Sequence, residues 1–188
     1  MERIRRPRSR PDNEVPVPVV VDSPVLSTGD QAAWLESCRV YSTGVELEFV
    51  LLSRDPEQRR PHQLELLVGV EFADGRWTST YGAQPDVDPE APVLHAQGGG
   101  GTDNRMSESY YLSPVPPEGP CTVYFALPDT DLADGEVVLA GARLNTAAAA
   151  VRELWPWRPR ESSTAPVHVP VPPPGSWFRS HPEPGLPD

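Results

Sequence analysis

The chain has 188 residues, which is enough for one domain with residues left over for flanking segments. Only 38% of the residues are hydrophobic, and the 25 prolines are most frequent near the two ends. The net charge is −11, and residues 25–157 hold eight Arg against twenty Asp and Glu, a net charge of −12. A domain with this charge repels polyanions, so we expect no binding to nucleic acid.

Residues 1–24 are rich in Arg and Pro. Such a segment buries too little apolar surface to offset the entropy of ordering, so we expect a disordered N-terminal tail. The alternative is that residues 15–21 lie along the domain as an extended edge segment. Pro16 and Pro18 interrupt the short apolar stretch that an export signal would need, so we expect a cytoplasmic protein. No stretch approaches the roughly 18 apolar residues of a membrane span, so we expect no membrane contact.

The first strands are expected from residue 33 onward. Residues 33–41 read as a strand with irregular alternation, whereas residues 45–51 and 64–72 alternate between apolar and polar side chains, as strands with one buried face do. Asp74 and Gly75 form a hairpin signal, and residues 76–81 form the return strand. The outward phase of these strands is expected to form an exposed acidic face made by Glu46, Glu48, Glu65 and Glu71.

A long loop is predicted over residues 82–105, because it contains several prolines and the glycine run 98–101. Three further strands are expected at residues 106–112, 122–127 and 136–140. Apolar residues then recur at helical spacing until Pro156, which should end the helix. We expect Phe72, Phe125 and Trp155 to be core residues.

Seven short strands separated by turn signals predict an all-β protein, specifically an immunoglobulin-like two-sheet β-sandwich of about seven strands with one C-terminal helix. A barrel is the alternative. The domain is expected to span residues 25–157. Residues 158–188 include nine prolines and are expected to form a disordered C-terminal tail.

Several short segments support a family resemblance. They are Arg39–Gly44, Val68–Arg76, Gly98–Gly101, Tyr110–Tyr111 and Val151–Pro156. Over about 120 residues their order and spacing resemble an uncharacterised family of actinobacterial proteins. The resemblance implies a β-sandwich with no assigned activity, and it supplies no catalytic residue.

No cofactor or metal site is predicted. Cys38 and Cys121 lack nearby histidines for zinc, and they are expected to be reduced core residues, although they could pair across a sandwich. The glycine run lacks the lysine of a phosphate-binding loop. The remaining polar candidates are an acidic loop, four scattered histidines and three residues that could line a cleft: Asp86, Asp88 and Glu90; His62, His95, His168 and His181; Asp103, Arg105 and Glu108.

The leading functional hypothesis is a non-enzymatic protein-interaction or scaffold module with an unknown protein partner. The proline-rich tail is the best candidate for contact, because proline favours the extended conformation that many binding grooves recognise. The alternative is a small-ligand-binding or hydrolytic enzyme with a cleft under residues 82–105. Residues expected to contact a protein are Glu46, Glu48, Glu65, Glu71, Pro172, Pro173, Pro174 and Trp177.

Overall fold

The computed structural model describes residues 8–54, 66–81, 91–102, 104–128, 133–157 and 174–177. Each of the seven predicted strands has a counterpart in this part of the chain. These are β4 (Gln31–Tyr41), β5 (Gly44–Ser53), β6 (Leu67–Phe72), β7 (Trp77–Ser79), β9 (Arg105–Ser113), β10 (Pro120–Ala126) and β11 (Gly135–Ala140). Further strands are β1 (Glu14–Val15), β2 (Val17–Val19), β3 (Leu26–Ser27), β8 (Val93–Gly101) and β12 (Arg152–Glu153).

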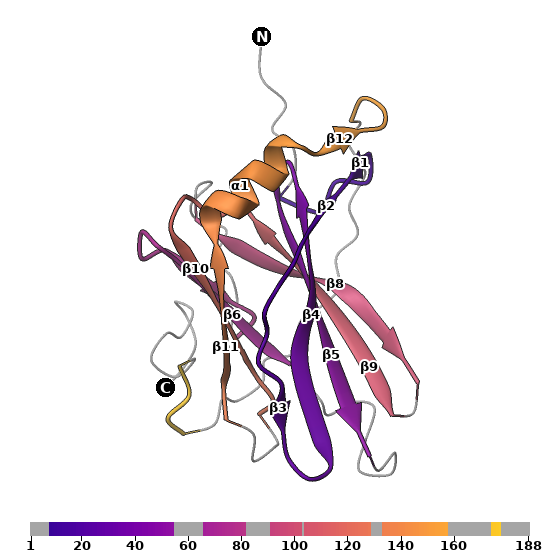
Figure 1. Ribbon diagram of the computed structural model, residues 1–188, viewed down its shortest axis with the longest axis vertical. Coiled ribbons are helices and arrows are strands. Elements are labelled where there is room, and N and C mark those ends of the chain that lie inside the picture. The colour runs from indigo at the N-terminus through magenta and orange to yellow at the C-terminus, as the bar shows by residue number, and fades with distance from the viewer. Residues whose placement is uncertain are drawn as a thin grey trace.

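Two antiparallel sheets face each other across the core (Figure 1). The six-stranded sheet has the order β2-β4-β5-β9-β8, with β3 also pairing with β4, and the four-stranded sheet has the order β11-β10-β6-β7. Helix α1 (Gly141–Ala149) lies across one end of both sheets and contacts β2, β4 and β11. The all-β sandwich prediction is therefore confirmed, and so is a helix that caps the sheets. No helix among the described residues is long and apolar enough to cross a membrane.

The core lies between the two sheets, where large aromatic rings meet. Phe49 of β5 and Phe125 of β10 approach to 5.4 Å between ring centroids, and Phe72 of β6 is also buried, which confirms the two predicted core phenylalanines. Gly135 pairs with Phe125 in register, and a Cβ atom at Gly135 would lie only 2.4 Å from the Phe125 ring. Glycine at this position therefore makes room for the central ring.

The irregular alternation of β4 has a structural cause. The register between β4 and β5 shifts between Leu35 and Ser37, which is the position of a β-bulge. One extra residue moves the inward phase from odd to even positions. Consequently Ala33, Leu35, Cys38 and Val40 all face the core.

The prediction of a loop over residues 82–105 is wrong for most of its described part. Strand β8 runs through the glycine run and pairs with β9. Gly98 has a φ of 109° and lies at a register shift in β8. A Cβ at Gly99 would lie 2.3 Å from the carbonyl oxygen of Ser107 on β9. Glycine thus permits a bulge and a close approach to β9 that a larger residue would prevent.

The predicted helix ends earlier than expected. Helix α1 stops at Ala149, and β12 follows it and pairs with β1. Trp155, predicted to be a core residue, is 57% exposed, so that prediction is wrong. The backbone of this segment is held by Asn13, whose side chain donates to the carbonyl oxygen of Trp155 at 2.7 Å. Pairing with the N-terminal residues therefore replaces the last helical turn.

The prediction of a disordered tail over residues 1–24 is wrong for its described part. Strand β2 forms an edge of the six-stranded sheet, where Pro18 is tolerated because an edge strand has a partner strand on only one side and can lack an N–H donor on the other. Val17, Val19 and Val21 pack against the core. The alternative of an extended edge segment is the correct one, and the ordered unit begins before residue 25.

Candidate functional site

The four predicted acidic contact residues do not form one face. Glu46 and Glu48 lie on β5 in the six-stranded sheet, whereas Glu71 lies on β6 in the four-stranded sheet. The outer faces of the two sheets in a sandwich point in opposite directions, so the expectation of a shared acidic surface is wrong. Glu65 lies outside the described residues.

Glu46 is buried rather than exposed. Its side chain is 1% exposed and forms ion pairs with Arg10 and Arg39, the latter at 3.2 Å. Tyr41 donates a hydrogen bond to Glu46 at 3.2 Å, and burial together with the Glu46 charge raises the pKa of Tyr41 to about 12. The sequence pattern placed Glu46 on the correct side of β5, but Arg10, Arg39 and Tyr41 surround its carboxylate there.

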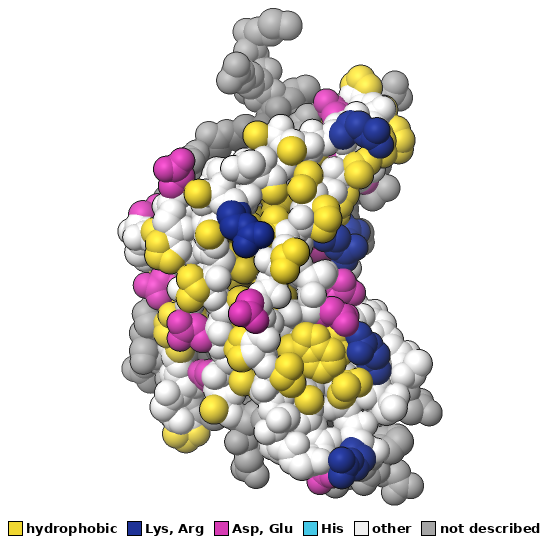
Figure 2. Space-filling model, in the orientation of Figure 1, with side chains coloured by type: hydrophobic (Ala, Val, Ile, Leu, Met, Phe, Trp, Pro, Cys, Tyr) yellow, Lys and Arg dark blue, Asp and Glu magenta, His cyan; other side chains and the backbone are white. Residues whose placement is uncertain are grey.

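Glu48 is also balanced by neighbouring groups. Ser37 donates a hydrogen bond to its carboxylate at 3.0 Å, and Arg39 forms an ion pair with it at 3.2 Å. Figure 2 shows acidic and basic side chains beside one another on the face it presents. Glu46 and Glu48 therefore contribute little to a net negative field on the six-stranded sheet.

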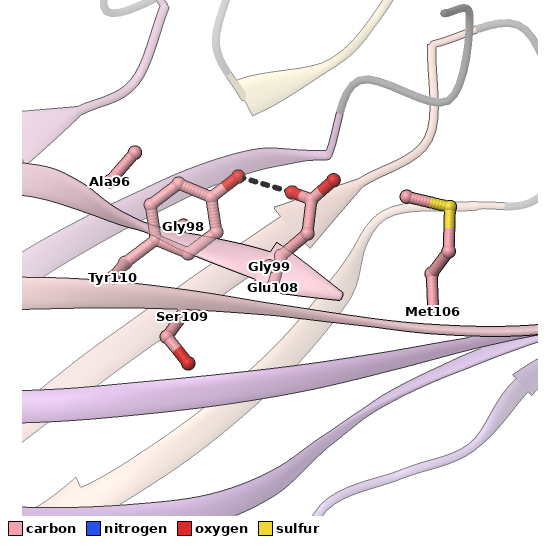
Figure 3. Close-up of a pocket in the computed structure, with 7 residues that line it drawn as sticks. All are labelled: Ala96, Gly98, Gly99, Met106, Glu108, Ser109 and Tyr110. Carbon is pink, nitrogen blue, oxygen red and sulfur yellow. Dashed lines mark hydrogen bonds between the residues drawn. The ribbon is translucent and has the colours of Figure 1, made fainter. Parts of the chain in front are cut away.

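A pocket of about 340 Å³ lies beside β8 and β9 (Figure 3). Met106, Glu108 and Tyr110 extend from the same side of β9, while the Ser109 side chain points away from them. Tyr110 donates to Glu108 at 2.7 Å, and its hydroxyl also lies 3.2 Å from the Leu66 carbonyl oxygen. Among the described lining residues, Glu108 and Tyr110 are the groups that titrate, and they bond to each other.

Of the two predicted cleft residues that the structure describes, one lines this pocket. Glu108 does, whereas Arg105 forms an ion pair with Glu36 at 2.7 Å and lies over the ring of Trp34. Asp103 lies outside the described residues, as do Asp86, Asp88 and Glu90 of the acidic loop. Within the described ranges no group of three or more His, Cys, Asp and Glu could hold a metal ion.

Both cysteine thiols are buried and free, one in each sheet. Cys38 lies on β4 and Cys121 on β10, and both belong to the core between the sheets. Burial raises the pKa of each thiol to about 12, and the Cys38 charge contributes to the shift at Cys121. Thiols with such a high pKa stay protonated and are poor nucleophiles at neutral pH.

The tail residue Trp177 packs against the outer face of the four-stranded sheet. Its ring stacks on Tyr124 of β10, with 4.7 Å between centroids and 15° between planes, and meets Trp77 of β7 edge to face at 5.8 Å. Beneath these rings lies a small apolar cluster that is separate from the main core. We call this surface the Trp177 platform, and its residues are Leu67, Trp77, Tyr81, Tyr124 and Ala126.

Asp134 fixes the backbone that carries Trp177. Its Oδ2 atom accepts hydrogen bonds from the Ser176 hydroxyl at 2.9 Å and from the backbone N–H of Trp177 at 3.3 Å. Gly175 has a φ of 81°, a conformation that favours glycine, and it turns the chain just before the buried Ser176. Pro174 is exposed, whereas Pro172 and Pro173 lie outside the described residues.

The platform is bordered by acidic groups of the four-stranded sheet. The Tyr124 hydroxyl lies 3.5 Å from Glu71, and burial followed by the Glu71 and Glu136 charges raises the pKa of Tyr124. Of the three predicted acidic contact residues that the structure describes, Glu71 is thus the one next to the Trp177 platform. Two signals pointed here from the sequence: Trp177 after a proline run, and aromatic residues on the polar phase of β7 and β10.

Comparisons of the chain with protein family models, with curated proteins and with solved structures find no match. The resemblance to an actinobacterial family rests on the sequence segments alone and stays a prediction. The immunoglobulin-like connectivity stays a prediction as well.

Proposed function

We propose that the chain is a non-enzymatic protein-interaction module and that the Trp177 platform is its contact surface. The observation that carries the proposal is the seating of Trp177 between Tyr124 and Trp77. A domain that holds a proline-flanked tryptophan on the outer face of a sheet has the chemistry to hold a similar segment of another protein.

The contacts on the platform combine affinity with selectivity. Each aromatic pair contributes about 0.5–1.5 kcal/mol beyond the burial of its surface. The two hydrogen bonds to an Asp134 carboxylate oxygen add directional contacts to the stacking of the rings. Any residue but proline can supply the backbone N–H, whereas the second bond requires a hydroxyl on the residue directly before the tryptophan. The ligand class is therefore a peptide that contains a hydroxyl–tryptophan pair.

The acidic residues beside the platform should also favour a peptide that carries a positive charge. Asp134, Glu71 and Glu136 all lie near the platform, and the chain's own segment carries Arg179 two residues after Trp177 in the sequence. A basic residue after the tryptophan would gain from these carboxylates. This attraction should weaken as salt is added, because the Debye length falls from about 10 Å at 0.1 M to about 3 Å at 1 M.

The test is an NMR titration of the full chain carrying Trp177→Ala, which vacates the platform. The titrant is a peptide with the sequence of residues 171–180. We expect saturable shifts at Leu67, Trp77 and Tyr124, with a Kd below about 1 mM, since that value corresponds to only about −4 kcal/mol.

A peptide in which alanine replaces Ser176 and Trp177 is the matched control and should leave the spectrum unchanged. The proposal is wrong if the authentic peptide shifts none of the platform resonances. It is also wrong if both peptides shift them equally, because the contact would then lack the selectivity that Asp134 and the rings imply.

The pocket beside β8 and β9 favours a second candidate function, the binding of a small ligand. Its wall offers the Met106 side chain, the ring of Tyr110 and the Glu108 carboxylate, which suits a mostly apolar ligand with one hydrogen-bond donor. A screen of such compounds against the wild-type chain and a Glu108→Gln variant would test it. Hits whose affinity does not change in the variant would not be using this pocket.

A further inference from the structure

The platform is filled by the same chain that builds it. The Trp177 ring is half-buried, and sixteen residues, 158–173, separate Pro174 from Trp157 of the domain. A ligand on such a tether does not need to be captured from solution. Its local concentration is set by the covalent connection, and we take about 1 mM as the order of magnitude for a ligand linked to its own site.

We infer that the C-terminal segment is a tethered ligand that closes the platform in the free chain, and that a partner protein with its own hydroxyl–tryptophan pair must displace it. This inference rests on the proposed function of the platform. The inference adds two statements: the platform is occupied by its own tail in the free chain, and a partner must share the sequence feature of residues 175–177.

The contacts of Trp177 suit an exchangeable occupant. Trp177 packs on Leu67 and Ala126, a cluster distinct from the main core between the sheets, so its departure leaves that core intact. Two hydrogen bonds of the segment end on Asp134, which lies just before β11. The segment therefore sits on the folded domain without filling its interior.

The local backbone further defines the partner's sequence. Gly175 adopts a φ of 81°, and nothing lies within 4 Å of a Cβ atom placed on it. The requirement for glycine is thus conformational and not one of space. Ser176 and Trp177 then supply the hydroxyl and the ring. The partner should present glycine, then serine or threonine, then tryptophan.

The test compares how strongly two full-length chains bind the same labelled peptide. Fluorescence anisotropy follows a fluorescein-labelled peptide of residues 171–180 added to the wild-type chain and to the Trp177→Ala chain. If the peptide has a Kd of about 0.1 mM for the open platform, a tether at about 1 mM should weaken binding to the wild type about tenfold. Trp155→Ala removes an exposed tryptophan elsewhere, so this chain should behave as the wild type does.

The outcomes separate this inference from the proposed function. If the peptide binds the wild-type and Trp177→Ala chains equally, the platform binds peptides but its own tail does not close it, and the inference is overturned alone. If neither chain binds the peptide, the proposed function falls with it. A wild-type chain that dimerises in sedimentation experiments, and becomes monomeric on Trp177→Ala, would show exchange between copies and overturn closure within one chain.

A second variant opens the platform by a different route. Ser176→Glu places a carboxylate against Asp134 and should repel the segment while leaving Trp177 in the chain. It should bind the labelled peptide as Trp177→Ala does, provided that its thermal unfolding shows a folded domain. An additional Asp134→Ala change in either open chain should abolish the preference for the peptide with Ser176 over one with alanine there.

Discussion

The two ends of the described chain resemble each other in composition but are held differently. Residues 8–19 and residues 174–177 are both flanked by prolines, and both were expected to be disordered. The N-terminal segment adds β2 to a sheet, buries Asn13 completely and pairs Arg10 with Glu46. The described part of the C-terminal segment adds no strand, and its contacts include ring contacts of Trp177 and hydrogen bonds to the Asp134 carboxylate.

The difference shows that proline content does not decide whether a segment is ordered. What decides is whether the domain offers unpaired strand edges, buried charges or open apolar surface that the segment satisfies. The N-terminal segment provides partners for buried groups that would otherwise lack them, such as the Glu46 carboxylate. The C-terminal segment covers a surface that could equally be covered by another protein.

Deleting each segment should produce the largest contrast. A chain that starts at residue 25 loses β1, β2 and the packing of Val17, Val19 and Val21, which should lower the free energy of unfolding by about 3–6 kcal/mol. A chain that ends at residue 170 should lose only about 1 kcal/mol. Urea unfolding measures both. Equal losses would mean that the two segments are held equally well.

Asn13→Ala should show how much of the N-terminal contribution comes from one buried amide. Its Nδ2 donates to Glu153 at 2.9 Å and to the Trp155 carbonyl oxygen at 2.7 Å. We expect a loss of about 1–3 kcal/mol, because the change removes two hydrogen bonds donated by a completely buried amide. Asn145→Ala is a matched control, since the exposed Asn145 also donates two hydrogen bonds to carbonyl oxygens and should cost under about 1 kcal/mol. Similar losses would rule out burial as the cause.

Comparing Glu46→Gln with Glu48→Gln should show how the free energy lost with a carboxylate charge depends on the burial of that carboxylate. The change removes the charge that Arg10 and Arg39 balance, and we expect a loss of about 1–2 kcal/mol, limited by the partial exposure of both arginines. Glu48→Gln, whose side chain is 28% exposed, should cost about 0–0.5 kcal/mol. A larger effect at Glu48 would mean that the N-terminal segment does not shield Glu46 in solution.

Trp177→Ala should be milder than the N-terminal changes. We expect a loss of about 1 kcal/mol, because two ring contacts disappear and a small apolar cluster becomes exposed. Trp155→Ala should change the free energy of unfolding by less than about 0.5 kcal/mol, since that ring is 57% exposed. Calorimetry on both variants gives the comparison. A loss above about 3 kcal/mol at Trp177 would make the C-terminal segment part of the fold itself.

The rate of thiol alkylation in the folded chain should also distinguish the N-terminal segment from the C-terminal segment. Burial raises the pKa of both thiols to about 12, so at pH 8 the folded chain exposes almost no thiolate and reacts only when it opens. Cys38 pairs in register with Val19 of β2, so weakening the N-terminal segment by Asn13→Ala should speed its alkylation. Trp177→Ala should leave the rate unchanged, and mass spectrometry after denaturation should count two free thiols.

The raised thiol pKa values also predict how stability depends on pH. As pH rises through the ordinary value of 9.0 towards about 12, the unfolded chain ionises its thiols while the folded chain does not. The unfolded state then binds fewer protons, so stability should fall by up to about 1.4 kcal/mol per pH unit for each thiol. Replacing Cys121 with alanine should reduce this slope. An unchanged slope would show that other groups cause the alkaline loss.

Strand positions could be predicted from the sequence because alternation is a local property. Val45, Leu47, Phe49 and Leu51 face the core as their spacing indicates, since a strand has a fixed period of two. The same rule placed Glu46 and Glu71 on outer faces correctly. It could not tell that β5 and β6 belong to opposite sheets, because sheet membership depends on long-range pairing.

The fate of the two ends was decided only by tertiary structure. The sequence of residues 8–19 does not show that they will pair with the buried Glu46 carboxylate and with the edge of β4. The sequence around Asp134 does not show that this residue will accept two hydrogen bonds from residues about forty positions later. By itself the sequence determined seven of the described strands, the inward phase of those that alternate regularly, and a tail with one tryptophan. Packing decided the rest, because burial and pairing depend on which distant groups the fold brings within a few ångströms.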